Sequence, residues 1–150
     1  MLMNLTRPLG QGKMVLFIFL GWLLAFPAIA LANDYKNFSM GCTNISLKSS
    51  YMKAECLDYD GLQSRKNTLD LDLCVGIDAS SLTLQWAMMG KMSGYCESCQ
   101  LDSTAPPVLS CVCQYTDSHS PVNSTLKLDD GIGNQNGTLY CHGGQGTISW

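Results

Sequence analysis

The chain has 150 residues, with nine Lys and Arg against twelve Asp and Glu, and it contains eight cysteines. A net-acidic chain without basic clusters argues against nucleic acid or an anionic membrane surface as a partner. The length allows one compact domain of common size.

The first 32 residues predict a secretory signal peptide. Arg7 and Lys13 precede an apolar run over residues 14–31, and Ala30-Leu31-Ala32 has the small-x-small pattern of a cleavage site. A membrane anchor is the alternative, because about 18 apolar residues suffice to cross a bilayer. The cleavage pattern favours a mature start at Asn33. The mature chain then has seven basic residues against twelve acidic ones, and we expect a soluble, secreted, extracellular protein with no membrane contact after cleavage.

Two stretches of the mature chain share one pattern at a constant offset of 57 residues. The matching positions are Cys42 and Cys99, Cys56 and Cys113, Leu69 and Leu126, Leu71 and Leu128, and Asp72 and Asp129. This predicts a tandem duplication, with a first repeat over about residues 35–86 and a second over about residues 95–141. Residues 142–150 are glycine-rich and are predicted to form a flexible tail.

Each repeat is predicted to consist of short strands. In the first repeat, residues 38–45 and 51–57 alternate in polarity, residues 58–61 form a turn signal, and residues 68–73 alternate strictly. Each repeat closes with a hairpin, which the second repeat marks with Asn136-Gly137. No 3.6-residue period is sustained over twelve residues. The class is therefore all-β, with a short 3₁₀ turn after each acidic strand.

Eight cysteines behind a signal peptide predict four disulfides formed in an oxidising compartment. Cys42 and Cys56 are 14 residues apart, as are Cys99 and Cys113, so we pair each couple across two strands and a turn. The remaining four cysteines are Cys74, Cys96, Cys111 and Cys141. They are predicted to pair among themselves, and three pairings are possible. The Cys96-x-x-Cys99 spacing also suits a redox or zinc half-site, but the neighbouring cysteines favour structural bridges. We expect no metal and no cofactor.

The order of these features resembles the cyanovirin-N homology family over about residues 35–141. The residues that carry the resemblance are Phe38-Ser39-x-x-Cys42, Leu69-Asp70-Leu71-Asp72, Trp86, and Ile132-Gly133-Asn134 with Asn136-Gly137-Thr138-Leu139. The extra cysteines resemble those of the filamentous-fungal branch. The resemblance implies an elongated, pseudosymmetric, β-barrel-like fold in which each terminal hairpin packs on the other repeat. Such proteins are small lectins, several of which bind mannose-rich glycans without metal in one or both of two pockets.

The resemblance implies a main carbohydrate-binding pocket built from the first repeat and the last hairpin. Its candidate residues are Asn37, Ser39, Asp58, Tyr59, Asp60, Asn134, Gln135 and Asn136. Carboxylates and amides can exchange hydrogen bonds with vicinal sugar hydroxyls, and a tyrosine ring can lie against a sugar's C–H face. Met40, Gly41 and Leu57 are less polar than the family's residues at this pocket. The simpler interpretation is that Asp58, Asp60 and Asn136 are ordinary turn residues that cap their own backbone.

A second pocket is implied at the other end of the fold. Its candidate residues are Asp78, Glu97, Ser98, Gln114, Tyr115 and Thr116, with Gly76, Ile77, Ser93 and Gly94 beside them. The family's Gly-Asn-x-Asp-Gly hairpin is replaced here by the segment 76–81, and residues 87–91 lengthen the linker. We therefore expect this pocket to be weak.

The leading hypothesis is a secreted lectin whose partners are glycans or glycoproteins, as a monomer or a domain-swapped dimer. The alternative is a structural or interaction module without sugar affinity. A hydrolase is disfavoured, because neither Gly-x-Ser-x-Gly nor His-Glu-x-x-His occurs and no apolar pocket is evident around Asp58 and Asp60. Four sequons are candidate N-glycosylation sites: Asn37, Asn44, Asn123 and Asn136. A glycan on Asn37 or Asn136 could block the main pocket.

Overall fold

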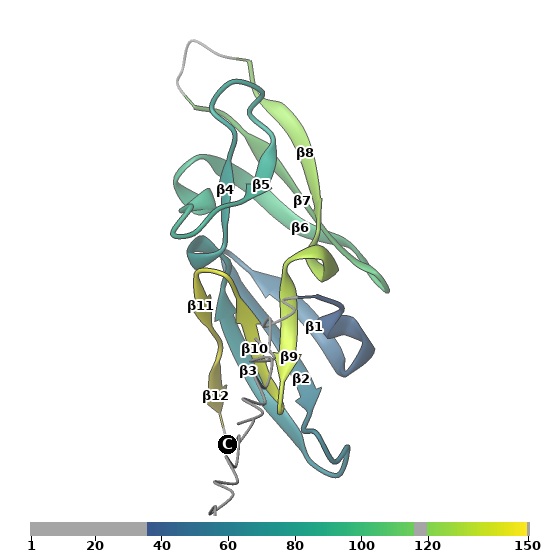
Figure 1. Ribbon diagram of the computed structural model, residues 1–150. Helices are drawn as coiled ribbons and strands as arrows, with labels where there is room; N and C mark the ends of the chain where they lie inside the picture. The colour runs from purple at the N-terminus through teal and green to yellow at the C-terminus, as the bar shows by residue number, and fades with distance from the viewer. Residues whose placement is uncertain (1–35, 116–119, 150) are drawn as a thin grey trace, which may run out of the picture. The chain divides into compact units, whose positions relative to one another are not determined.

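The computed structural model describes residues 36–115 and 120–149, which form strands and short 3₁₀ turns (Figure 1). The predicted all-β class is confirmed. The predicted signal peptide, residues 1–32, lies outside the described residues, and so does Thr116. No helix within the described ranges is long and apolar enough to cross a membrane.

The first repeat begins with a 3₁₀ turn and a three-stranded meander, followed by a second turn and a hairpin. Its elements are η1 (Phe38–Met40), β1 (Cys42–Lys48), β2 (Tyr51–Leu57), β3 (Ser64–Asp70), η2 (Leu71–Leu73), β4 (Val75–Ile77) and β5 (Leu84–Trp86). Burial alternates along β2, so Met52, Ala54 and Cys56 face the core while their neighbours face solvent. This alternation with a period of two residues is typical of a sheet that has one buried face and one solvent-exposed face.

The second repeat has the same succession of elements, and two further strands follow it. They are η3 (Met92–Gly94), β6 (Cys96–Thr104), β7 (Pro107–Cys113), β8 (Val122–Lys127), η4 (Leu128–Asp130), β9 (Ile132–Gln135), β10 (Thr138–Cys141), β11 (Gly144–Gln145) and β12 (Thr147–Ser149). Hydrogen bonds order the strands as β1-β2-β3-β12, β6-β7-β8, β11-β10-β9 and β4-β5, so the sheets are not joined into one closed barrel.

Each terminal hairpin packs on the other repeat, as the family resemblance implies (Figure 1). The Leu139 amide of β10 donates to Asn67 Oδ1 of β3 at 3.2 Å. The Leu84 amide of β5 donates to Ser124 Oγ of β8 at 2.8 Å. The two contacts occupy equivalent positions in the repeats. Leu69, Leu71, Leu128 and other buried side chains of both repeats therefore share one continuous core.

The predicted Cys42–Cys56 disulfide is confirmed, whereas the predicted Cys99–Cys113 disulfide is wrong. Cys113 bonds to Cys96, and Cys99 bonds to Cys111. Cys96 lies directly opposite Cys113 in the β6–β7 ladder, as Cys42 lies opposite Cys56. The β6–β7 hairpin is longer, since 17 residues separate its outer cysteines against 14 in the first repeat. Cys42 therefore corresponds to Cys96, and the constant offset of 57 does not hold at the start of the repeat.

The last disulfide joins Cys74 to Cys141, which is one of the pairings left open for the remaining four cysteines. It ties the end of η2 to the end of β10 and so fastens the exchanged hairpin to the first repeat. Cys96 and Cys111, which were predicted to pair within that set, instead bond to Cys113 and Cys99.

Two short strands, β11 and β12, lie in the segment for which the sequence predicts a flexible tail. β11 pairs with β10, and β12 pairs with β3 through Thr147 opposite Thr68 and Ser149 opposite Lys66. A Cβ at Gly143 would lie 1.6 Å from the carbonyl oxygen of Leu73. The glycines that suggested flexibility therefore allow close backbone packing.

Candidate functional site

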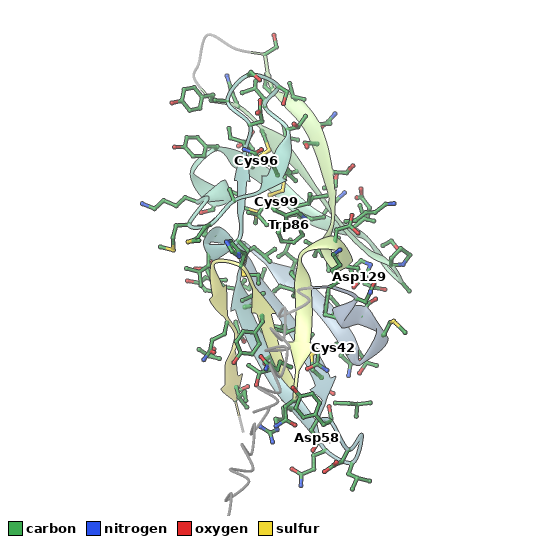
Figure 2. The ribbon with its side chains drawn as sticks, in the orientation of Figure 1. Cys42, Asp58, Trp86, Cys96, Cys99 and Asp129 are labelled. Atoms are coloured by element: carbon green, nitrogen blue, oxygen red, sulfur yellow. A yellow bond between two sulfur atoms is a disulfide. The ribbon has the colours of Figure 1, made fainter. Side chains whose placement is uncertain are left out.

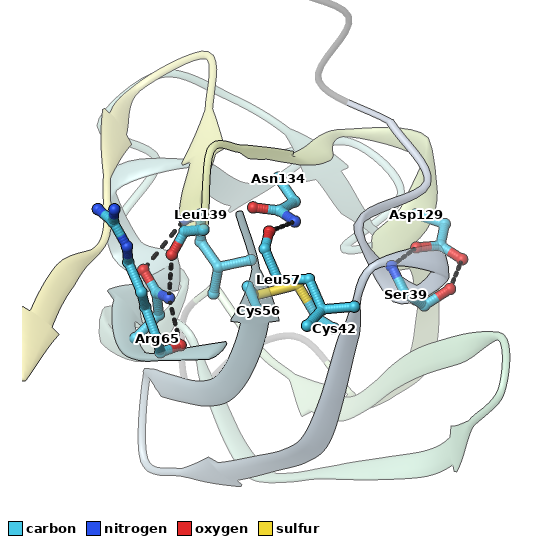
Figure 3. Close-up of a disulfide and its surroundings, with 10 residues drawn as sticks. Ser39, Cys42, Cys56, Leu57, Arg65, Asp129, Asn134 and Leu139 are labelled. Atoms are coloured by element: carbon cyan, nitrogen blue, oxygen red, sulfur yellow. Dashed lines mark hydrogen bonds between the residues drawn. A yellow bond between two sulfur atoms is a disulfide. The ribbon is translucent and has the colours of Figure 1, made fainter. Parts of the chain in front are cut away.

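The last hairpin brings two asparagines of the second repeat to the turn that follows β2. Asn134 Nδ2 donates to the Leu57 carbonyl at 2.8 Å, and Asn136 Oδ1 accepts from the Tyr59 amide at 3.2 Å. Figure 3 shows Asn134 above Leu57, next to the Cys42–Cys56 disulfide. The structure thus brings residues of the predicted main pocket together across 77 positions of sequence.

The turn between β9 and β10 positions the side chains of Asn134 and Asn136, because its sequence favours a two-residue hairpin turn. Asn136 and Gly137 have φ angles of 52° and 77°, the positive values that a two-residue hairpin turn requires at both central positions. Asn67, which is buried in β3, donates to the Gly137 carbonyl at 2.7 Å and holds the far side of the turn. The hairpin is therefore fixed at its tip as well as along its strands.

Two predicted members of this pocket have structural partners within the protein. The backbone amide and hydroxyl of Ser39 donate to the carboxylate of Asp129, as Figure 3 shows. Asp58 Oδ1 accepts from the amides of Leu62 at 3.2 Å and Gln63 at 3.4 Å, so it caps its own turn. Asp58 lies on the turn after β2 (Figure 2). The simpler interpretation as a turn residue therefore describes what Asp58 does in this structure.

The groups that face solvent at this pocket include an aromatic ring and several polar side chains. Tyr59 is 72% exposed, and Asn37, Asp60, Gln135 and Asn136 are also exposed. Asn134 Oδ1 is buried and has no donor among the described residues. Such an acceptor is usually satisfied by an ordered water or a ligand hydroxyl. The arrangement can offer a ring face and amide groups to a polyhydroxylated ligand.

A cavity of about 370 Å³ lies where the second pocket was expected. It is lined by Ser93, Gly94, Tyr95, Cys96, Glu97, Val112, Gln114, Tyr115 and Pro121. Neither Asp78 nor Ser98 is among its lining residues. Its volume is within the usual range of small-molecule sites. This end of the fold therefore has a better-formed hollow than the sequence indicated.

Tyr95 is an aromatic lining residue that the sequence analysis missed, and Val112 and Pro121 were missed as well. Its ring stacks on that of Tyr115, with centroids 5.5 Å apart and an angle of 18° between the planes. The sequence did contain a signal for Tyr95. It immediately precedes Cys96, just as Gly41 immediately precedes Cys42, so the two residues occupy equivalent positions in the repeats. The incorrect register of the repeats hid this correspondence.

The hairpin of the first repeat lacks the two asparagines with which the last hairpin contacts the first pocket. Ile77 and Ala79 stand where the last hairpin has Asn134 and Asn136, and Ile77 packs against the core. Asp78 accepts from the Ser80 hydroxyl and amide and from the Ser81 amide and hydroxyl. These hydrogen bonds, the Ser80 hydroxyl first, lower the pKa of Asp78 from 3.8 to about 2. Asp78 therefore stabilises its own loop.

Among the residues that the structure describes, no three His, Cys, Asp or Glu side chains come together as a metal site would require. All described cysteines are in disulfides.

The four sequon asparagines are exposed, and Asn44 Nδ2 donates to Glu55 Oε2 at 3.0 Å.

The sequence model of the CVNH domain matches residues 38–140 of the chain. The NMR structure of the Gibberella zeae CVNH protein is 31% identical, with a TM-score of 0.59 over 70% of this chain and 96% of that one. The structure of the T. borchii CVNH protein is 26% identical, with a TM-score of 0.58 over 71% and 99% of the two chains. A MoCVNH3 variant in complex with (N-GlcNAc)4 has a TM-score of 0.64 at 19% identity, over 73% and 99%. The comparison with curated proteins gave no match.

Proposed function

Because the chain belongs to the CVNH family, we propose that it is a carbohydrate-binding protein whose main site is the first pocket. The observation that carries this proposal is the docking of the last hairpin on the turn after β2. Asn134 and Asn136 each use one amide atom to bind the backbone of that turn. The opposite amide atom of Asn136 and the ring of Tyr59 stay available to a sugar.

The ligand class we propose is mannose-type oligosaccharides, with N-acetylglucosamine oligomers as the second class to examine. The first class follows from the family resemblance. The second follows from the MoCVNH3 variant, which was solved with (N-GlcNAc)4. We also propose that the protein is secreted, because four disulfides form most readily in an oxidising compartment.

We propose a binding role without catalysis. The pair of carboxylates considered for glycoside hydrolysis was Asp58 and Asp60. Asp58 lies on a solvent-facing turn, and its carboxylate accepts from the backbone amides of Leu62 and Gln63, so it caps that turn.

A glycan array on protein made in bacteria tests this proposal. Tyr59→Ala removes the exposed ring and should lower affinity roughly tenfold, the upper range for one aromatic contact. Tyr51→Ala is the matched control, because Tyr51 is an exposed tyrosine of β2 at 49% exposure, outside the pocket. Binding that resists Tyr59→Ala but is lost in Tyr115→Ala would move the main site to the second pocket.

The alternative function is a structural or interaction module that keeps the fold without sugar affinity. A well-folded protein that gives no signal for any mannose or N-acetylglucosamine oligomer would favour it. The solvent-facing apolar side chains near the first pocket, Leu57 and Leu62, are the observation behind this alternative, since they offer little to a sugar hydroxyl.

A further inference from the structure

A third hollow lies away from both predicted pockets, on the outer face of the sheet β1-β2-β3-β12. Its volume is about 300 Å³. The polar side chains among its lining residues include Asn44, Ser46, Lys53, Lys66, Thr68 and Ser149. Ser149 belongs to β12, beyond the residues 38–140 that match the family domain. The C-terminal strand therefore adds Ser149 to a hollow whose other lining residues lie within the family domain.

Two lysines line the hollow, and neither forms an ion pair with a residue that the structure describes. Lys53 pairs with Thr68 and Glu55 pairs with Lys66 in the β2–β3 ladder, so the two lysines are diagonal neighbours on one face. Diagonal positions are about 7–8 Å apart, close enough for two long side chains to reach one ligand. No carboxylate lies within 4.0 Å of either ammonium among residues 36–115 and 120–149.

Glu55, which lies opposite Lys66 in the β2–β3 ladder, already has a hydrogen-bond partner. Glu55 Oε2 accepts from Asn44 Nδ2 at 3.0 Å, which directs it toward β1. Two ammonium groups with the same charge repel each other on this face, and an anion placed between them relieves that repulsion. Glu55 also lines the hollow, and the remaining polar groups are hydroxyls and amides, which exchange hydrogen bonds with sugar hydroxyls.

We propose that this sheet face binds an acidic oligosaccharide, one that carries carboxylate or sulfate groups, independently of the two predicted pockets. Lys53 and Lys66 contact the anionic groups, while Ser46, Thr68 and Ser149 contact the neighbouring hydroxyls. Since the net charge of the mature chain is negative, the attraction is local to this face and is screened by salt.

The test is a binding titration of the full mature protein at low salt, followed by amide chemical shifts in NMR. The probes are oligogalacturonate, a heparin-derived hexasaccharide, a neutral mannose oligomer, a glutamate-rich peptide and inorganic sulfate. We expect both acidic saccharides to shift the amides around Lys53, Lys66 and Ser149. The neutral oligomer should leave these amides unchanged.

The double variant Lys53→Gln with Lys66→Gln should weaken binding of the acidic saccharides roughly tenfold, as expected for two exposed charge contacts. The matched control is Lys91→Gln with Lys127→Gln, which changes the net charge equally at two exposed lysines elsewhere. The control variant and Tyr59→Ala should bind as the wild type does.

Three outcomes would overturn the proposal. The first is no binding of either acidic saccharide at low salt, and the second is equal weakening by the two double variants. The third is equal binding of the glutamate-rich peptide or of sulfate alone, which would assign the lysines to a general anion contact. Because Tyr59→Ala leaves this face intact, failure here is distinguishable from failure of the first-pocket proposal.

Discussion

Trp86 covers Gly131 so closely that a Cβ at Gly131 would lie 2.3 Å from the indole Cε2. Figure 2 shows Trp86 within the side chains of the core region. In the other half of the molecule, the equivalent positions are Cys141 and Cys74, which form a disulfide. The last hairpin is therefore joined to the first repeat by a covalent bond. The hairpin of the first repeat is held on the second repeat by the contact of Trp86 with Gly131.

Gly131→Ala should destabilise the protein by about 1–3 kcal/mol, because the added methyl group overpacks the contact with Trp86. The free energy of unfolding in urea measures this change. Gly94→Ala is the control, since a Cβ at Gly94 meets no atom within 4 Å and should change the stability little. Equal unfolding midpoints for the wild type and Gly131→Ala would show that the indole moves aside.

Removal of the Cys74–Cys141 disulfide by two alanine substitutions should destabilise the protein by about 4 kcal/mol. The chain-entropy account gives about 3 kcal/mol for Cys42–Cys56, because that loop is shorter. Urea unfolding of the two double variants gives the comparison. The prediction fails if the Cys42–Cys56 pair proves the more stabilising of the two.

Peptide mapping of the oxidised protein should recover Cys96 with Cys113 and Cys99 with Cys111. Cleavage after Glu97 separates Cys96 from Cys99, and cleavage beside Val112 separates Cys111 from Cys113. Mass spectrometry of the linked fragments then identifies each pair. A fragment that joins Cys99 to Cys113 would contradict the register of β6 and β7.

Asn67→Ala should cost about 3 kcal/mol of stability, because it leaves the Gly137 carbonyl and the Leu139 amide buried without partners. Ser124 is the equivalent residue in the second repeat, and among the described residues its side chain bonds to the Leu84 amide alone. Ser124→Ala should therefore cost less. Urea unfolding measures both variants, and a larger loss for Ser124→Ala would refute the hydrogen-bond account.

The Asp78 carboxylate should titrate with a pKa of about 2 in the folded protein, and Ser80→Ala should raise this pKa toward 3.8. Because the folded-state pKa lies below the ordinary value, the stabilisation is complete above about pH 4. It is lost as the pH falls through about 2. Carbon NMR of the carboxyl group measures the titration, with Ser120→Ala as the control. A wild-type pKa near 3.8 would contradict the hydrogen-bonded loop.

Protein made in a glycosylating host should bind sugars more weakly than protein made in bacteria. Asn37 and Asn136 are exposed sequon residues assigned to the first pocket, and Asn136 accepts from the Tyr59 amide, so a glycan on Asn136 occupies space beside Tyr59. Thr138→Ala removes the Asn136 sequon while it keeps the hydrogen bond to Tyr59, and it should restore part of the binding. Equal array signals from both preparations would count against this expectation.

Local patterns were sufficient for the strands, for the Asn136-Gly137 turn and for the Cys42–Cys56 bridge. Alternation in polarity reports which face of a strand is buried, and a tight turn places its own flanking residues opposite each other. The family resemblance added the exchange of hairpins, and with it the meeting of Asn134 with Leu57. These features depend on residues that are close in sequence or on a known topology.

Only the tertiary structure decided which cysteine lies opposite Cys113, where Tyr95 packs, and what the C-terminal segment does. A three-residue difference in hairpin length changes the register of a whole ladder, so equal spacing in sequence does not ensure equal pairing in space. The glycines at 143 and 144 carry no local sign that they pass against Leu73. Their role is set by Leu73 of η2, which is distant in sequence, and β12 then completes the edge of β3.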